Sequence, residues 1–200
     1  MKISKLARSE SAMTVRGKFL LQPEHAVLVV IDIQDRLCAA MDRDRLHQVV
    51  RNAGILLESA QELEVPVIFT EQYVKGLGPT VAGLKEKAPA AACHEKMTFS
   101  CCGNGAFLDQ LKLGGRTQVI VCGMETHVCV LQTVIDLLSD GFTVHVVKDA
   151  VMSRSNDNRQ TALEAMTLAG AVPTSTESVV FQLLKVAGTD SFRKLSKLVK

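Results

Sequence analysis

Residues 119–130 read VIVCGMETHVCV, a stretch that predicts a buried strand running straight into a helix. Its first half is an unbroken apolar run with β-branched residues, which is typical of a strand inside a parallel sheet. Gly123 then breaks the run. From Thr126 onward, apolar residues recur three and four positions apart, so a helix is expected with Thr126 as its N-cap.

Cys129 lies in the first turn of this expected helix, just past the carboxyl end of a central strand. The partial positive charge of a helix N-terminus lowers the pKa of a thiol, which favours a reactive thiolate. A free cysteine also serves as a small buried hydrophobic residue. This stretch alone leaves both interpretations of Cys129 open.

The composition of the chain fits one α/β domain. Of its 200 residues, 47% are hydrophobic, which is enough for a continuous core. A formal net charge of +2 implies neither nucleic acid nor an anionic membrane as partner, and a chain with no Trp and one Tyr has few rings for base stacking. No apolar run is long enough to span a bilayer.

The N-terminus has no signal-peptide pattern, so a cytoplasmic location is expected and the six cysteines are expected to be reduced thiols. Residues 1–20 are basic and are predicted to form a flexible tail before a single domain of residues 21–200. Organelle transit peptides have a similar composition, so import into an organelle is the alternative.

Further apolar segments complete the expected sheet and alternate with helical patterns. Besides 119–122, the expected strands are 26–31, 66–69, 91–95, 142–147 and 178–181, the last of which is equally compatible with a helix start. Helical periodicity is found over 45–63, 104–113, 156–169, 182–187 and 191–199. This alternation predicts a three-layer α/β/α sandwich, Rossmann-like, around a mostly parallel six-stranded sheet.

If strands 1 to 3 are added one after another toward one edge of the sheet and strands 4 to 6 toward the other edge, the sheet order is 3-2-1-4-5-6. The expected ligand site is then the crevice outside the carboxyl ends of strands 1 and 4. Asp32 ends the first strand, Lys96 follows the third, and Cys129 follows the fourth. An aspartate at this position can also cap the next turn, and a lysine is usually a solvated surface charge. We expect all three side chains to reach the crevice.

These three residue types fit nucleophilic catalysis. Asp32 can accept the thiol proton of Cys129, while Lys96 and the helix N-terminus favour the thiolate. Backbone N–H groups near Glu125 and Cys129 can hold an oxyanion. His127 precedes Cys129 by two residues, so their side chains diverge, which argues against a Cys–His pair.

Four motifs extend this pattern along the chain: VVIDIQ (29–34), EKMTFS (95–100), GMETHVCV (123–130) and VVKDAVMSRS (146–155). In content and order they resemble the isochorismatase-like cysteine hydrolases, over a region from about Pro23 to the C-terminus. The resemblance implies the isochorismatase-like fold and a triad of Asp32, Lys96 and Cys129. It also implies a non-proline cis peptide between Met124 and Glu125 at the oxyanion site, and a homo-oligomer, either a dimer or larger.

The chain departs from the nicotinamidases of this family, which have an Asp and several His as metal ligands after the second strand. Here that loop reads TEQYVKGLG, without His, so neither a metal nor another cofactor is expected. Isochorismate hydrolysis cleaves a vinyl ether and can proceed without a cysteine. The presence of Cys129 instead favours acyl transfer, as in the hydrolysis of an amide or a related bond. Residues in the motifs and in the loop after the second strand are candidate substrate contacts: Gln34, Gln72, Tyr73, Phe99 and Thr126.

The sequence therefore predicts a cysteine hydrolase that cleaves a C–N bond in a small amide, carbamoyl or related compound. Two alternatives stay open. One is a vinyl-ether hydrolase that uses Asp32 as an acid, and the other is a non-catalytic oligomeric binding or scaffold protein that keeps the family's pocket. The expected partner is a small molecule, with no nucleic acid and no membrane.

Overall fold

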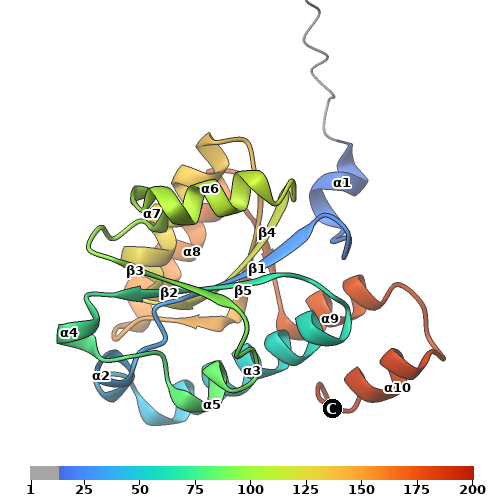
Figure 1. Cartoon of the computed structure of the whole chain (residues 1–200), viewed down its shortest axis with the longest axis horizontal. Helices are drawn as coiled ribbons and strands as arrows, with labels where there is room; N and C mark the ends of the chain where they lie inside the picture. Colours follow the sequence, from blue (N-terminus) through green and yellow to red (C-terminus); the bar gives the residue numbers. More distant parts are fainter. Residues whose placement is uncertain (1–13) are drawn as a thin grey trace, which may run out of the picture.

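The computed structural model describes residues 14–200, which contain one parallel six-stranded sheet of order β3-β2-β1-β4-β5-β6 (Figure 1). The strands are β1 (Ala26–Ile31), β2 (Val67–Gln72), β3 (Ala92–Lys96), β4 (Gln118–Met124), β5 (Thr143–Met152) and β6 (Val172–Thr174). The strand order reverses between β1 and β4, which confirms the predicted topology and sets the carboxyl ends of these two strands side by side.

Helices cover both faces of the sheet, so the molecule has the predicted three layers (Figure 1). They are α1 (Val15–Phe19), α2 (Asp35–Ala39), α3 (Arg43–Glu62), α4 (Val74–Leu77), α5 (Ala82–Lys85), α6 (Gly105–Leu113), α7 (Leu131–Ser139), α8 (Asn156–Leu168), α9 (Thr176–Leu184) and α10 (Asp190–Leu195), with a 3₁₀ turn η1 (Cys101–Gly103) and a π-helical turn η2 (Thr126–Val130). Helices α3 and α9 lie on one face, and α6, α7 and α8 lie on the other.

The apolar run of β1 has no exposed residue because its alternate side chains enter two different cores. Leu28 and Val30 pack with α3 and α9, whereas Val27 and Val29 pack with α6, α7 and α8. A strand buried on both faces needs no polar alternation, which explains the continuous hydrophobic pattern. The central strands are therefore fixed firmly enough to hold functional groups at their ends.

The sixth strand is not where one interpretation of the sequence placed it. Residues 178–181 belong to helix α9, and β6 is the short segment Val172–Thr174. Ser175 caps α9 by accepting a hydrogen bond from the Ser178 N–H, and the buried side chains of Val180 and Leu184 follow at helical spacing. The predicted helix over 182–187 is displaced as well, since α9 ends at Leu184 and Lys185 has a positive φ of 60°.

Thr126 is not the N-cap of the helix after β4. Glu125 has the extended cap conformation, and Thr126 lies inside η2, where its hydroxyl is buried without a hydrogen-bond partner among residues 14–200. A π-helical turn is wider than an α-turn and is frequently found at functional sites. Cys129 therefore lies in the π-helical segment that precedes α7.

Most of the predicted N-terminal tail lies outside the described residues. Its last part, residues 14–20, includes the short helix α1. The side-chain amide of Gln118 donates hydrogen bonds to the carbonyls of Gly17 and Leu20, each at 2.9 Å. These contacts attach α1 to the amino-terminal end of β4.

Gly123 brings β1 and β4 close together where the site begins. It has a φ of 127°, and a Cβ added there would lie 2.0 Å from the carbonyl oxygen of Ile31. Only a residue without a side chain fits this approach. The glycine that interrupts the apolar run therefore allows the end of β4 to lie directly beside Asp32, the next residue after Ile31.

His145 gives the fold a built-in sensitivity to acid. It lies in β5 with 0% exposure, and a contact with the Lys18 backbone offsets only part of the cost of burying its ring. Burial lowers its pKa from 6.5 to about 4. Between these two pH values the folded state binds fewer protons than the unfolded chain. The contribution of His145 to the free energy of unfolding is therefore fully present above pH 6.5 and is lost as the pH falls to 4.

We expect His145→Leu to remove this part of the pH dependence. Urea unfolding from pH 7 to pH 4 should show a loss of up to about 3 kcal/mol in the wild type that is absent from the variant. His47→Leu, at an exposed histidine, is the matched control. An equal pH dependence in wild type and His145→Leu would contradict the assignment.

Candidate active site

Asp32 is the first residue after β1 and is completely buried, with a positive φ of 50°. One carboxylate oxygen, Oδ2, lies 2.7 Å from the ammonium of Lys96, and the other, Oδ1, accepts a hydrogen bond of 2.8 Å from the hydroxyl of Thr70. Its backbone N–H donates to the carbonyl of Thr70. A buried carboxylate needs such partners, and here both oxygens have one.

Lys96 ends β3, and its side chain is 1% exposed. Its ammonium donates to four oxygens: Asp32 Oδ2, Gln72 Oε1 at 2.8 Å, and the carbonyls of Thr98 at 3.3 Å and Phe99 at 3.0 Å. Burial is the largest single influence on Lys96 and lowers its pKa, but the negative charge of Asp32, the hydrogen bond to it and the nearby sulfurs of Cys101 and Cys129 together outweigh burial, so the pKa is raised. Lys96 is therefore a fixed positive charge inside the site rather than a surface lysine.

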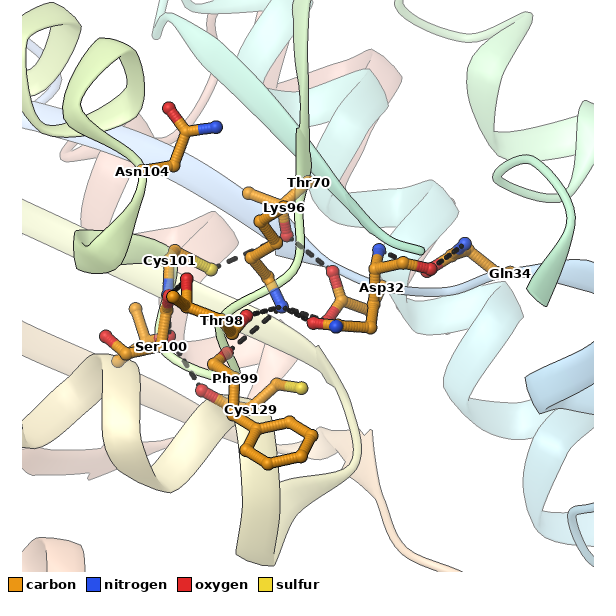
Figure 2. Close-up of polar contacts among 12 residues, drawn as sticks. Asp32, Gln34, Thr70, Lys96, Thr98, Phe99, Ser100, Cys101, Asn104 and Cys129 are labelled. Carbon is orange, nitrogen blue, oxygen red and sulfur yellow. Dashed lines mark hydrogen bonds and ion pairs between the residues drawn. The ribbon is translucent and has the colours of Figure 1, made fainter. Parts of the chain in front are cut away.

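Cys129 comes to the same place from η2, and its side chain lies beside Lys96 and Asp32 (Figure 2). The expectation of a lowered thiol pKa is wrong for this state of the protein. Burial, and after it the negative charge of Asp32, raise the pKa of Cys129 to about 12, although Lys96 acts in the opposite direction. The resting cysteine is thus a neutral thiol next to a carboxylate that can take its proton.

This pKa predicts the labelling behaviour of Cys129. Alkylation by iodoacetamide should be slow at pH 7 and should accelerate up to about pH 12, because only the thiolate reacts. Asp32→Asn should increase the labelling rate at pH 8, since it removes the negative charge that disfavours the thiolate. Peptide mass spectrometry measures the rate at each cysteine, and exposed Cys93 is the internal control. A slower rate in Asp32→Asn would contradict this account.

Two threonines and a second cysteine connect Asp32 to Cys129. The Thr133 hydroxyl donates to the Cys129 carbonyl at 2.7 Å and accepts from the Cys101 N–H at 2.9 Å. The Cys101 thiol is 3.5 Å from the Thr70 hydroxyl, which in turn holds Asp32. Sequence reasoning missed these residues, although Thr70 directly follows the strand predicted at 66–69.

A further contact fixes the turn that follows Lys96. The Ser100 hydroxyl donates to Asp136 Oδ2 of α7 at 2.6 Å. This turn supplies the Thr98 and Phe99 carbonyls to Lys96, so the ion pair and the helix that follows Cys129 are held in one hydrogen-bonded unit (Figure 2).

Gln34 and Gln72, two candidate substrate contacts, are engaged within the protein. The fully buried Gln34 amide accepts from the Gln72 N–H at 2.7 Å and donates to the carbonyls of Gln72 and Gly78. The Gln72 side chain accepts from Lys96 and donates to the Met97 carbonyl. Both amides therefore hold Lys96 and the loop after β2 in place.

Met124 and Glu125 are joined by a cis peptide bond, at the position that the sequence motif implies. The Glu125 carboxylate accepts hydrogen bonds from the backbone N–H of Arg154 at 3.0 Å and from its guanidinium Nε at 3.1 Å. The hydrogen bonds and positive charge of Arg154 outweigh burial and lower the pKa of Glu125. An ionised Glu125 thus anchors the segment between β4 and Cys129 to the end of β5.

The remaining candidates, Tyr73 and Phe99, are 45% and 55% exposed. Tyr73 follows Gln72 directly, and the Phe99 carbonyl contacts Lys96. Asp32, Lys96 and Cys129 are each 6% exposed or less, so access to the thiol of Cys129 is narrow in this single chain.

No group of three or more His, Cys, Asp and Glu side chains in residues 14–200 is arranged to hold a metal ion. In the same region, no helix is both long and apolar enough to cross a bilayer.

The family model "Isochorismatase domain" matches residues 26–178, so the chain belongs to the isochorismatase family of hydrolases. "Isochorismatase family protein 1B" of Dictyostelium discoideum is 37% identical over 191 residues, or 93% of this chain and 91% of that protein. The chain resembles a solved structure titled MAR1 ribonuclease from Caenorhabditis elegans, with a TM-score of 0.84 and 38% identity over 90% of this chain and 92% of that one. An octameric hydrolase of unknown specificity from Escherichia coli has a TM-score of 0.83 and 25% identity, with 90% of both chains covered.

Proposed function

We propose that this chain is a cysteine hydrolase that cleaves the C–N bond of a small amide, carbamoyl or related compound. The proposal rests on one observation: the thiol of Cys129 lies beside a completely buried Asp32–Lys96 ion pair. A buried ion pair is costly for a protein to maintain, and groups of this kind cluster at functional sites. Asp32 acts as the base, Lys96 as the fixed positive charge and Cys129 as the nucleophile.

In the first half of the reaction, Asp32 takes the proton from the Cys129 thiol as the sulfur attacks the substrate carbonyl carbon. The carbonyl π electrons move onto oxygen, and the backbone N–H groups of Glu125 and Cys129 are the proposed donors to this oxyanion. When the C–N bond breaks, the leaving nitrogen takes the proton from Asp32. A thioester on Cys129 and a free amine or ammonia result.

In the second half, Asp32 removes a proton from a water molecule, whose oxygen attacks the thioester carbonyl. The C–S bond breaks, and the Cys129 sulfur takes back the proton. The products are a carboxylic or carbamic acid and the original thiol. Lys96 keeps the carboxylate of Asp32 oriented through both halves, because its other three hydrogen bonds leave it no freedom to turn away.

Narrow access to Cys129 favours a small, compact substrate. Exposed Tyr73, Met97 and Phe99 follow the strands that hold the site, and they provide an apolar surface beside it. We propose that the chain forms a homo-oligomer in which this surface is covered; the octameric assembly of the E. coli neighbour supports the oligomer. We also propose a cytoplasmic location. The single domain of residues 21–200 and the candidate contacts Tyr73, Phe99 and Thr126 are part of the same proposal.

The test is a screen of small amides, carbamates and ureides with release of ammonia or amine as the readout. Any substrate found is then mixed with the enzyme and quenched for intact-mass analysis. A mass increase equal to the acyl group, mapped to Cys129 and absent from Cys129→Ala, is the expected result. Turnover without any acyl adduct, retained in Cys129→Ala, would refute the mechanism.

The other candidates give different outcomes in the same assays. A vinyl-ether hydrolase keeps activity in Cys129→Ser but loses it in Asp32→Asn. Because the C. elegans neighbour is titled a ribonuclease, a short RNA belongs in the screen, and RNA cleavage that depends on Cys129 would replace the amide proposal. A non-catalytic binding protein gives no turnover with any compound.

A further inference from the structure

A polar cavity is lined by residues other than Asp32, Lys96 and Cys129. It has a volume of about 300 Å³ and is enclosed by α3, the end of β5 and the start of α8. Its polar lining includes Arg45, Gln48, Lys148, Asp149, Asn156 and Arg159. The volume is at the lower limit of ligand-binding cavities, so it fits a small ligand.

The cavity exists because β5 leaves the sheet locally. Residue Val146 pairs with Val121 of β4, but the next pairing joins Val151 to Gly123, so β5 has extra residues in between. Such bulges turn side chains away from the regular alternation and are over-represented next to functional sites. Here the bulge directs Lys148 and Asp149 toward α3 and α8.

The lining has more positive than negative charge. Three cationic side chains line the cavity, those of Arg45, Lys148 and Arg159, together with one carboxylate, that of Asp149. Oδ1 of this carboxylate already accepts hydrogen bonds from the N–H and hydroxyl of Thr176. Within residues 14–200, the side chains of Arg45 and Lys148 have no hydrogen bond or ion pair. Two cationic groups are therefore free to bind a ligand.

Arg159 is different because it has a structural role. Its guanidinium donates to the carbonyls of Lys148 and Val151, beyond the point where β6 stops pairing with β5. Burial, and then the positive charge of Arg45, lower the pKa of Arg159. The positive charges of Arg45 and Arg159 thus oppose each other in the cavity, and Asp149 compensates this only in part.

We propose that this cavity binds the phosphate group of a small anionic compound through Arg45, Lys148 and Arg159. Guanidinium and ammonium groups form their strongest hydrogen bonds with oxyanions, and a phosphate brings up to two negative charges to three cations. The first residue of α8, Asn156, lines the same cavity, so the positive end of that helix dipole adds to the attraction.

The test measures binding of inorganic phosphate by isothermal titration and by thermal shift, with NaCl holding the ionic strength constant. We expect saturable binding to the wild-type full chain with a Kd on the order of 1 mM. Arg45→Gln/Lys148→Gln should weaken it at least about tenfold, because two charge-assisted contacts are lost. Both residues are exposed, so the fold should survive, whereas Arg159 is left unchanged because it holds β5.

Lys112→Gln/Arg193→Gln is the matched control, since it removes two exposed cations elsewhere and should bind phosphate like the wild type. Cys129→Ser should also bind normally, which separates this site from the proposed catalytic one. Three results would overturn the proposal: no saturable binding to the wild type, equal binding by Arg45→Gln/Lys148→Gln, or acetate binding as tightly as phosphate.

Discussion

Cys129→Ala is expected to reduce kcat/KM for an identified amide substrate by at least about 10³-fold, because the nucleophile that forms the covalent intermediate is lost. Asp32→Asn should lose a similar factor for a different reason, since the thiol then has no base to take its proton. The double variant should be little worse than either single variant, because groups that act as one unit are not additive.

The measurement is the initial rate of product release, with unfolding by urea as a check on each variant's fold. Cys93→Ala is the matched control, because Cys93 is an exposed cysteine on β3 and has no part in the proposed reaction. If Asp32→Asn loses activity on the amide while Cys129→Ser keeps most of it, the sulfur is not the nucleophile and the proposed thioester mechanism is wrong. If neither variant loses activity, the triad is not the catalytic group.

The sheet could be predicted from the sequence because its central strands are buried on both faces. Continuous apolar runs such as 26–31 are produced by that burial, and the polar residues that end them, Asp32 above all, are then conspicuous. The short edge strand β6 has only three residues, one of them Pro173, and gives no such signal. Helix α9 was ambiguous because its buried residues Val179 and Val180 are β-branched, as in a strand.

Within the site, residues whose types are unusual for their position could be predicted, and residues of ordinary type could not. A lysine at the end of a strand and a cysteine after a glycine break are such signals. Thr70, Thr133 and Cys101 are common core residue types, and only the three-dimensional packing shows that they connect Asp32 to Cys129. The raised pKa of Cys129 depends on burial, which a sequence motif does not report.

Lys96→Met is expected to destabilise the fold by about 3–5 kcal/mol, because it leaves the carboxylate of Asp32 buried without its counter-charge. The Thr70 hydroxyl and the Cys129 thiol would remain as neutral donors to that carboxylate, and neither replaces the positive charge of Lys96. Asp32→Asn should cost less, since the ammonium of Lys96 keeps Gln72 and two carbonyls as acceptors.

The double variant Lys96→Met/Asp32→Asn should recover part of this loss, because no unpaired charge then stays buried. A double-mutant cycle from urea unfolding should give a coupling energy of at least about 2 kcal/mol between the two residues. Lys194→Met is the control, since its ion pair with Glu62 is on the surface and should contribute less than about 1 kcal/mol. A Lys96→Met variant as stable as Lys194→Met would mean that water reaches Asp32, and the proposed dry, narrow site would be wrong.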